Sequence, residues 1–158
     1  NKLMADFIIE PLSNELKEQL EQGTTELLGN PVTTVIADAK PGYPCRLSLE
    51  DAEPGAELHL FSHATFSCSN AYRETGPVFI RKNAKPAKLP VNELPDVAYA
   101  RSIIFRAYDS EGTILSASPA EAGDLSGTLG RLLDDKHVDF VHLRAVVSGC
   151  FLCEARRA

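Results

Sequence analysis

The stretch YARSIIFRAYDSEGTILSA, residues 99–117, decides the fold class of this chain. Its first part is rich in β-branched and aromatic residues around Ile103-Ile104-Phe105 and predicts the strongest strand, residues 99–109. Asp109-Ser110-Glu111-Gly112 is typical of a hairpin turn, and residues 113–117 follow as the return strand. Two strands joined by a tight turn are antiparallel, so this stretch predicts an antiparallel sheet.

Further short elements are predicted on both sides of this hairpin. The other expected strands are residues 7–9, 32–37, 45–49, 57–63, 77–81, 138–147 and 150–156. One amphipathic helix is expected over residues 14–22, between the N-cap Ser13 and Gly23. A second is expected after the capping box at residues 118–121, along a leucine stripe from Leu125. The predicted fold class is α+β, a mostly antiparallel β-sheet of about six to eight strands with two short helices.

The regions between these elements are expected to be irregular. Residues 24–30 form a connector with room for one helical turn around Leu27 and Leu28, and residues 64–76 and 82–95 are expected to be loops.

Composition favours one globular domain and excludes some partners. The chain has 158 residues, with 44% hydrophobic and 24% charged. One domain is expected over residues 4–158, with Asn1 to Leu3 left over from cloning because Met4 is the single methionine. The net charge of −6 disfavours nucleic acid. The apolar runs are too short for a membrane span or a signal peptide, so a cytoplasmic location with free thiols is expected.

The stretch PGYPCR, residues 41–46, combines a rigid backbone with reactive side chains. Pro44 restricts the backbone just before the Cys45 thiol, and Arg46 beside it favours the thiolate. If residues 45–49 form a strand, however, Cys45 faces one side and Arg46 the other. Cys45 is therefore either a nucleophilic or redox thiol or a buried structural cysteine.

Two further side chains suit a polar site. His142 lies in the middle of a predicted strand and has the pKa range of an acid or base near neutral pH. Its alternative is a core-edge histidine satisfied by one hydrogen bond. Arg106 lies within an apolar strand, where a guanidinium needs either a bound anion or an ion-pair partner.

Metal binding is not expected from the remaining cysteines and histidines. Cys150 and Cys153 form a C-x-x-C motif, but positions three apart on a strand face opposite sides. His59 and His63 share one strand face without an identifiable acidic partner, so both are read as half-exposed strand residues. Cys68 is expected to be an exposed thiol in a polar loop.

Several separate blocks together resemble the bacterial family called domain of unknown function 1203. They are PGYPCR with SLEDA at 48–52, AYRETGPVFIR at 71–81, RAYD at 106–109 before Gly112, VH at 141–142 and GC at 149–150. The resemblance implies a small, stand-alone bacterial domain, and it lends no activity because none is assigned to the family. The family pattern has a second histidine and an asparagine where this chain has Arg144 and Ala145, so any chemistry of that pair is in doubt here.

The leading functional hypothesis is a site for a small anionic molecule, without a cofactor or metal. Cys45 would be the nucleophile and His142 its base. The binding residues would be Tyr43, Arg46, Tyr72, Arg73, Arg106 and Cys150. The arginines would hold a carboxylate or phosphate through bidentate hydrogen bonds.

The competing hypothesis is a non-catalytic binding or interaction module in which the same residues are structural. Whether the protein is an enzyme therefore stays open. A homodimer that uses the edge of strand 99–109 is a further option.

Overall fold

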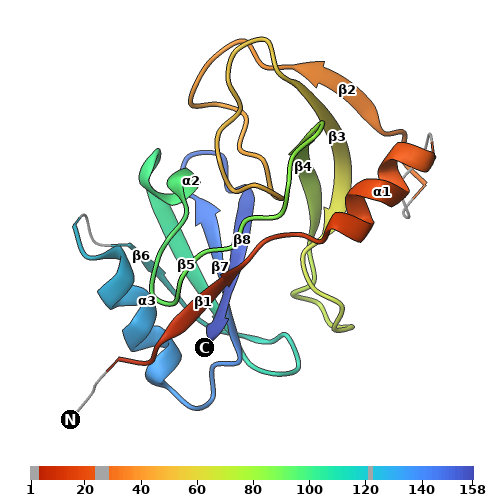
Figure 1. Ribbon diagram of the computed structural model, residues 1–158. Helices are drawn as coiled ribbons and strands as arrows, with labels where there is room; N and C mark the ends of the chain where they lie inside the picture. Colours follow the sequence, from red (N-terminus) through yellow and green to blue (C-terminus); the bar gives the residue numbers. More distant parts are fainter. Residues whose placement is uncertain (1–3, 24–28, 121–122) are drawn as a thin grey trace.

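The computed structural model describes residues 4–23, 29–120 and 123–158, and these form eight strands and three helices (Figure 1). The elements are β1 (Phe7–Glu10), α1 (Asn14–Gln22), β2 (Thr33–Ile36), β3 (Glu57–Ala64), β4 (Thr75–Arg81), α2 (Asp96–Tyr99), β5 (Ile103–Tyr108), β6 (Ile114–Pro119), α3 (Leu125–Asp134), β7 (Phe140–Ala145) and β8 (Phe151–Arg157). The predicted α+β class is confirmed, and so is the antiparallel sheet structure. No helix among the described residues is long and apolar enough to span a bilayer.

The strands form two antiparallel sheets. The larger sheet has five strands in the order β1-β8-β7-β5-β6, and the smaller has three in the order β2-β3-β4. The predicted hairpin joins β5 to β6: the Asp109 N–H donates to Thr113 O at 3.0 Å, and Gly112 has φ of 79°. A side chain at Gly112 would also collide with the ring of Phe66, 2.7 Å from an ideal Cβ position. Glycine is therefore required here for conformation and for space.

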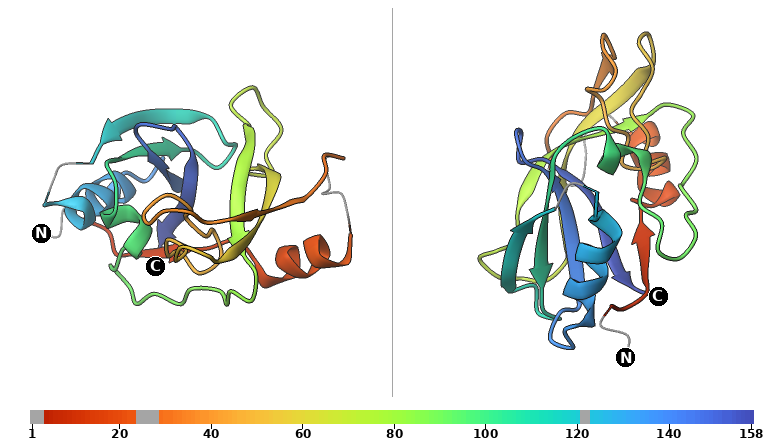
Figure 2. Two further views of the ribbon diagram at one scale, coloured as in Figure 1. Left: turned by 90° about the horizontal axis from the view of Figure 1, so that it is seen from above. Right: turned by 90° about the vertical axis from the view of Figure 1, so that its left-hand side faces the viewer.

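The two faces of the five-stranded sheet differ in chemistry because alternate residues on a strand face opposite sides. One face is apolar: Phe105 and Leu143 pair across β5 and β7 and lie in one buried cluster with Leu129 and Leu133 of α3. The other face carries the polar side chains of Arg106, His142 and Arg144 beside the rings of Tyr108 and Phe140, and Phe66 of the loop at 65–74 packs against these rings. Figure 2 shows the two sheets as two halves of the molecule, with α3 outside the larger sheet and α1 beside the smaller.

Helix α1 forms where the sequence predicts an amphipathic helix, and it packs against the three-stranded sheet. The Leu16 N–H donates to Ser13 Oγ at 3.2 Å, which confirms Ser13 as the N-cap. Leu20 is buried in a second cluster with Phe61 and Val78 of the small sheet.

The predicted strand at 45–49 is wrong, because these residues form a turn buried between the two sheets. The Leu49 N–H donates to Cys45 O at 2.9 Å, and Leu49 has φ of 59°, a conformation that leucine rarely adopts. Cys45, Arg46 and Leu49 are all buried, so there is no inward and outward alternation. Cys45, Leu47 and Leu49 are apolar because the turn is packed against other parts of the chain, and not because they share one face of a strand.

Several further boundaries differ from the prediction. A short third helix, α2, occupies the start of the expected strand 99–109, so β5 begins only at Ile103. The capping box at 118–121 does not start a helix, because Pro119 ends β6 and α3 begins at Leu125. Glu121 of that box, the expected cloning remnant at 1–3 and the turn around Leu27 and Leu28 lie outside the described residues.

Candidate functional site

A cavity of about 170 Å³ lies between the first half of β4 and the hairpin that joins β7 to β8. Its polar lining comes from His63, Thr65, Glu74, Arg144, Ser148 and Cys150. Thr75, Pro77, Ser148 and Gly149, which also line it, are exposed, so the cavity opens to solvent. It is large enough for several water molecules or one small organic molecule.

Arg144 is the buried cation of this cavity. It lies on the polar face of β7, and only 6% of its surface is exposed. Its Nη1 donates to Gly149 O at 2.8 Å and its Nη2 pairs with Glu74 Oε2 at 2.5 Å. Its Nε is buried and has no hydrogen-bond partner among the described residues. A buried N–H without an acceptor is unfavourable by about 1–3 kcal/mol, so Arg144 carries one donor that the described residues leave unsatisfied.

Glu74 links Arg144 to Arg106 on the neighbouring strand β5. One carboxylate oxygen accepts a hydrogen bond from Arg106 Nη1 at 2.9 Å, and the other pairs with Arg144. Burial raises the pKa of Glu74, but the hydrogen bond from Arg106 and the charge of Arg144 outweigh it and leave the pKa below its ordinary value. Two guanidinium groups against one carboxylate leave the cluster with one excess positive charge.

Arg46 lies immediately behind the cavity wall and is 2% exposed. Its Nε donates to Phe151 O at 2.8 Å and its Nη1 to Pro44 O at 2.5 Å. Among the described residues no carboxylate forms an ion pair with it. Burial lowers its pKa to about 10, and the largest opposing influence is the neighbouring Cys150.

Cys45 does not line the cavity. Its thiol is 1% exposed, and its Sγ accepts hydrogen bonds from the N–H groups of Ser48 at 3.4 Å and Arg81 at 3.3 Å. His142 was expected to act as the base for Cys45. Among the described residues, no hydrogen bond joins these two side chains. The surroundings of Cys45 are those of a buried structural cysteine.

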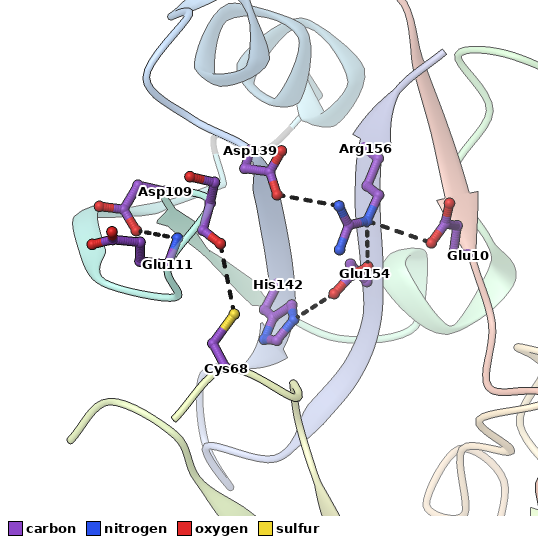
Figure 3. Close-up of polar contacts among 9 residues, drawn as sticks. Glu10, Cys68, Asp109, Glu111, Asp139, His142, Glu154 and Arg156 are labelled. Atoms are coloured by element: carbon purple, nitrogen blue, oxygen red, sulfur yellow. Dashed lines mark hydrogen bonds and ion pairs between the residues drawn. The ribbon is translucent and has the colours of Figure 1, made fainter. Parts of the chain in front are cut away.

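His142 is fully buried on the polar face of β7 and begins a chain of hydrogen bonds and ion pairs that reaches the surface (Figure 3). Its Nε2 lies 3.0 Å from Glu154 Oε1, and Glu154 Oε2 accepts from Arg156 Nε at 2.8 Å. Arg156 in turn pairs with Asp139 at 3.3 Å and with Glu10 at 3.6 Å. This chain fixes the orientation of the imidazole.

An aromatic cluster encloses the same imidazole. The ring centroids of Phe151, Phe140, Tyr108 and Phe66 lie 4.9, 5.0, 5.1 and 5.9 Å from that of His142. Burial lowers the pKa of His142, although Glu154 opposes this. His142 therefore touches Phe151 of the cavity wall but does not itself line the cavity.

This environment predicts acid sensitivity. Because the pKa of His142 is lower in the folded chain than in the unfolded chain, where it is about 6.5, the unfolded chain binds more protons as the pH falls. We expect the free energy of unfolding to decrease by up to about 2 kcal/mol between pH 6.5 and pH 5 on this account. His63, whose pKa burial also lowers, contributes with the same sign. Urea denaturation at several pH values measures the effect.

Two variants separate His142 from the other histidines. His142→Phe keeps a ring in the aromatic cluster and should make the decrease shallower. His137→Gln, at an exposed position, should leave it unchanged. An equal pH dependence in all three proteins would contradict the assignment.

The other expected binding residues lie apart from the cavity. The Tyr43 hydroxyl donates to Asp38 Oδ1 at 2.9 Å, and its ring packs 5.3 Å from that of Phe79. Tyr72 and Arg73 are exposed in the loop that precedes Glu74. Of the expected site residues, Cys150 lines the cavity, Arg106 reaches it through Glu74, and Arg46 and His142 lie behind it.

Sequence reasoning missed Arg144, Glu74 and His63 as site residues. The argument that singled out Arg106, a guanidinium in an apolar strand, applies equally to Arg144 in the strand FVHLRA. Glu74 carries no such local signal, because it lies in a polar loop. His63 was read as a half-exposed strand residue, and it does lie on β3, partly exposed at the cavity.

The two cysteines of the C-x-x-C motif occupy different surroundings, as expected. Cys150 lines the cavity, whereas Cys153 is buried in the apolar core, where burial raises its pKa to about 12. All four cysteines are free thiols, and Cys68 is partly buried rather than fully exposed. Within the described residues, no group of three or more His, Cys, Asp or Glu side chains is arranged to hold a metal ion.

Comparison with known proteins identifies the family. No curated protein and no solved structure matches this chain. The model of one family, described as "Protein of unknown function (DUF1203)", matches residues 42–157. That span runs from within PGYPCR to the end of β8 and includes every residue that lines the cavity. The chain therefore belongs to the DUF1203 family, as its sequence blocks predicted.

Proposed function

We propose that this protein binds a small carboxylate in the cavity between β4 and the β7–β8 hairpin. The observation that carries the proposal is the buried Nε of Arg144, which has no acceptor among the described residues of its own chain. A ligand carboxylate would satisfy this donor, and a hydrogen bond between charged groups contributes about 1.5–3 kcal/mol.

The surroundings of Arg144 favour a carboxylate over other ligands. The cluster of Arg144, Arg106 and Glu74 carries one excess positive charge, and its two arginines already hold one carboxylate, that of Glu74. Ser148 supplies a hydroxyl on the cavity wall, and its Oγ accepts from the Cys150 N–H at 3.3 Å, which leaves its O–H free to donate. Burial keeps the pKa of His63 low, so this imidazole is neutral at pH 7 and adds no charge.

The remaining predicted residues support the site from behind. Arg46 holds the carbonyl of Phe151, and His142 packs against the Phe151 ring. Cys45 packs in the same cluster as Phe151. In this proposal these three residues shape the cavity wall, and the reactive thiol is not Cys45.

The proposal is tested by titrating the protein with succinate at constant ionic strength and following backbone amide shifts by NMR. We expect saturable shifts at Gly149 and Gly76, both of which line the cavity, and none with the uncharged analogue succinamide. Arg144→Met should weaken succinate binding about tenfold or more, because one charged hydrogen bond is lost. Arg144→Lys keeps the charge but lacks the Nε–H, so it should also bind more weakly.

Arg131→Met provides the matched control. Arg131 lies on α3, half exposed and paired with Asp124, and does not line the cavity. Its replacement should leave succinate binding unchanged. Shifts confined to other surfaces, or equal binding by the Arg144 variants, would contradict the proposal and favour an interaction module in which these residues serve the fold.

A further inference from the structure

Two buried arginines hold the backbone on either side of Cys150. Arg144 Nη1 donates to the carbonyl of Gly149, the residue before it, at 2.8 Å. Arg46 Nε donates to the carbonyl of Phe151, the residue after it, at 2.8 Å. The thiol of Cys150 lines the cavity and is partly exposed. The backbone on both sides of this cavity cysteine is thus held by guanidinium groups from different parts of the fold.

We propose that Cys150 exchanges with a small disulfide that carries a carboxylate, forming a mixed disulfide within the cavity. This inference rests on the proposed carboxylate binding, since Arg144 would hold the carboxylate while the Cys150 sulfur attacks. It assigns the reactive thiol to Cys150 rather than to Cys45.

The electrostatics at Cys150 support this assignment. Thiolates are the reactive form of cysteine, and neighbouring cations stabilise them. Arg46 has no carboxylate partner among the described residues, and Cys150 is the largest influence that opposes the lowering of its pKa by burial. Cys150 therefore lies within electrostatic reach of a buried guanidinium that has no counter-ion among the described residues.

The exchange is balanced in atoms and electrons. Cys150 loses its proton to water, and the thiolate sulfur attacks one sulfur of the incoming disulfide. The bond between Cys150 Sγ and that sulfur forms as the original S–S bond breaks. The second half of the disulfide leaves as a thiolate and takes up a proton. The Cys150 sulfur is oxidised and the leaving sulfur is reduced.

Neither Cys153 nor Cys45 is placed to resolve this product. Cys153 is 1% exposed in the apolar core on the other side of the sheet, and burial raises its pKa to about 12. Cys45 is held by two backbone N–H groups and is also 1% exposed. We therefore expect a persistent mixed disulfide that external thiols reverse, rather than an internal Cys150–Cys153 disulfide.

The test uses three disulfides of similar size and different charge: dithiodipropionate with two carboxylates, bis(2-hydroxyethyl) disulfide with none, and cystamine with two ammonium groups. Peptide mapping by mass spectrometry gives the rate of modification at Cys150 and at Cys68 in the same molecule. Cys68, partly exposed in the loop at 65–74, serves as the internal reference, because the ratio of the two rates cancels the intrinsic reactivity of each reagent.

We expect the ratio of the Cys150 rate to the Cys68 rate to be about tenfold higher for dithiodipropionate than for the neutral disulfide, and lowest for cystamine. The net charge of −6 acts on both cysteines, so it does not explain a preference that depends on Arg144. Arg144→Met and Arg144→Lys should both reduce it, and succinate should slow modification of Cys150 by the neutral disulfide.

The possible failures are distinguishable. If succinate binds in an Arg144-dependent manner but the three reagents give equal rate ratios, the exchange is refuted and the carboxylate site stands. If succinate does not bind and the three reagents give equal rate ratios, both the carboxylate site and the disulfide exchange are refuted. The comparison of reagents on the unaltered protein decides the matter even if an Arg144 variant does not fold.

Discussion

Replacing Arg101 with methionine should lower the free energy of unfolding by about 3–5 kcal/mol, because it leaves a buried carboxylate without its counter-ion. Arg101 Nη2 lies 2.5 Å from Asp51 Oδ1, and the Asp51 side chain is only 4% exposed. The same arginine donates to Val97 O at 2.6 Å. This pair ties the turn that follows PGYPCR to α2 and the start of β5. Urea denaturation measures the loss.

Two variants make the Arg101 result specific. Arg131→Met removes an arginine whose pair with Asp124 is half exposed on both sides, and should cost about 0.5 kcal/mol. Adding Asp51→Asn to Arg101→Met removes the stranded charge and should recover part of the loss. If Arg101→Met cost no more than Arg131→Met, the Arg101–Asp51 pair would not stabilise the fold as the structure indicates.

Phe105→Ala should destabilise the protein by a similar amount, about 3–5 kcal/mol, because it opens a cavity at the centre of the larger core. Phe105 is fully buried in β5, pairs with Leu143 across to β7, and shares its cluster with α3. Few neighbouring side chains can move into the space, since both strands are held by hydrogen bonds on either side. The midpoint of urea unfolding reports this loss if the slope of the transition is unchanged.

Tyr99→Ala is the control for Phe105→Ala. Tyr99 is also an aromatic residue at the start of the predicted strand, but it ends α2 and is 63% exposed. Its replacement should change stability by no more than about 0.5 kcal/mol. Equal effects of the two substitutions would mean that the core does not depend on Phe105.

The sequence correctly predicted those elements that depend on interactions between residues close together in the chain. The turn at 109–112 carries a glycine where a positive φ is required, and the hairpin forms there. Ser13 caps α1 and the leucine spacing of residues 12–20 turns one helix face inward. Such features depend on neighbours a few residues away, so they are visible in the sequence.

The same reasoning failed at residues 45–49, where a buried turn has the alternating sequence pattern of a strand. Cys45, Leu47 and Leu49 alternate with Arg46 and Ser48, which is the pattern of a half-buried strand. In the structure, Arg46 is as buried as its apolar neighbours and bonds to the carbonyl of Phe151, 105 positions away. A buried arginine held by a distant backbone carbonyl has no signature in its own segment.

The candidate site shows the same division. Sequence alone determined that the chain is an antiparallel α+β domain, that an arginine in the apolar strand around Arg106 needs a partner, and that the chain belongs with the DUF1203 family. That Glu74, Arg106 and Arg144 meet, and that Cys150 rather than Cys45 borders their cavity, follows from the three-dimensional packing of the chain. The reason is that the pairing of β5 with β7 places Arg106 and Arg144 on neighbouring strands, and their ion pairs with Glu74 join them to a loop of the other half of the molecule. Neither contact is between residues close in the sequence.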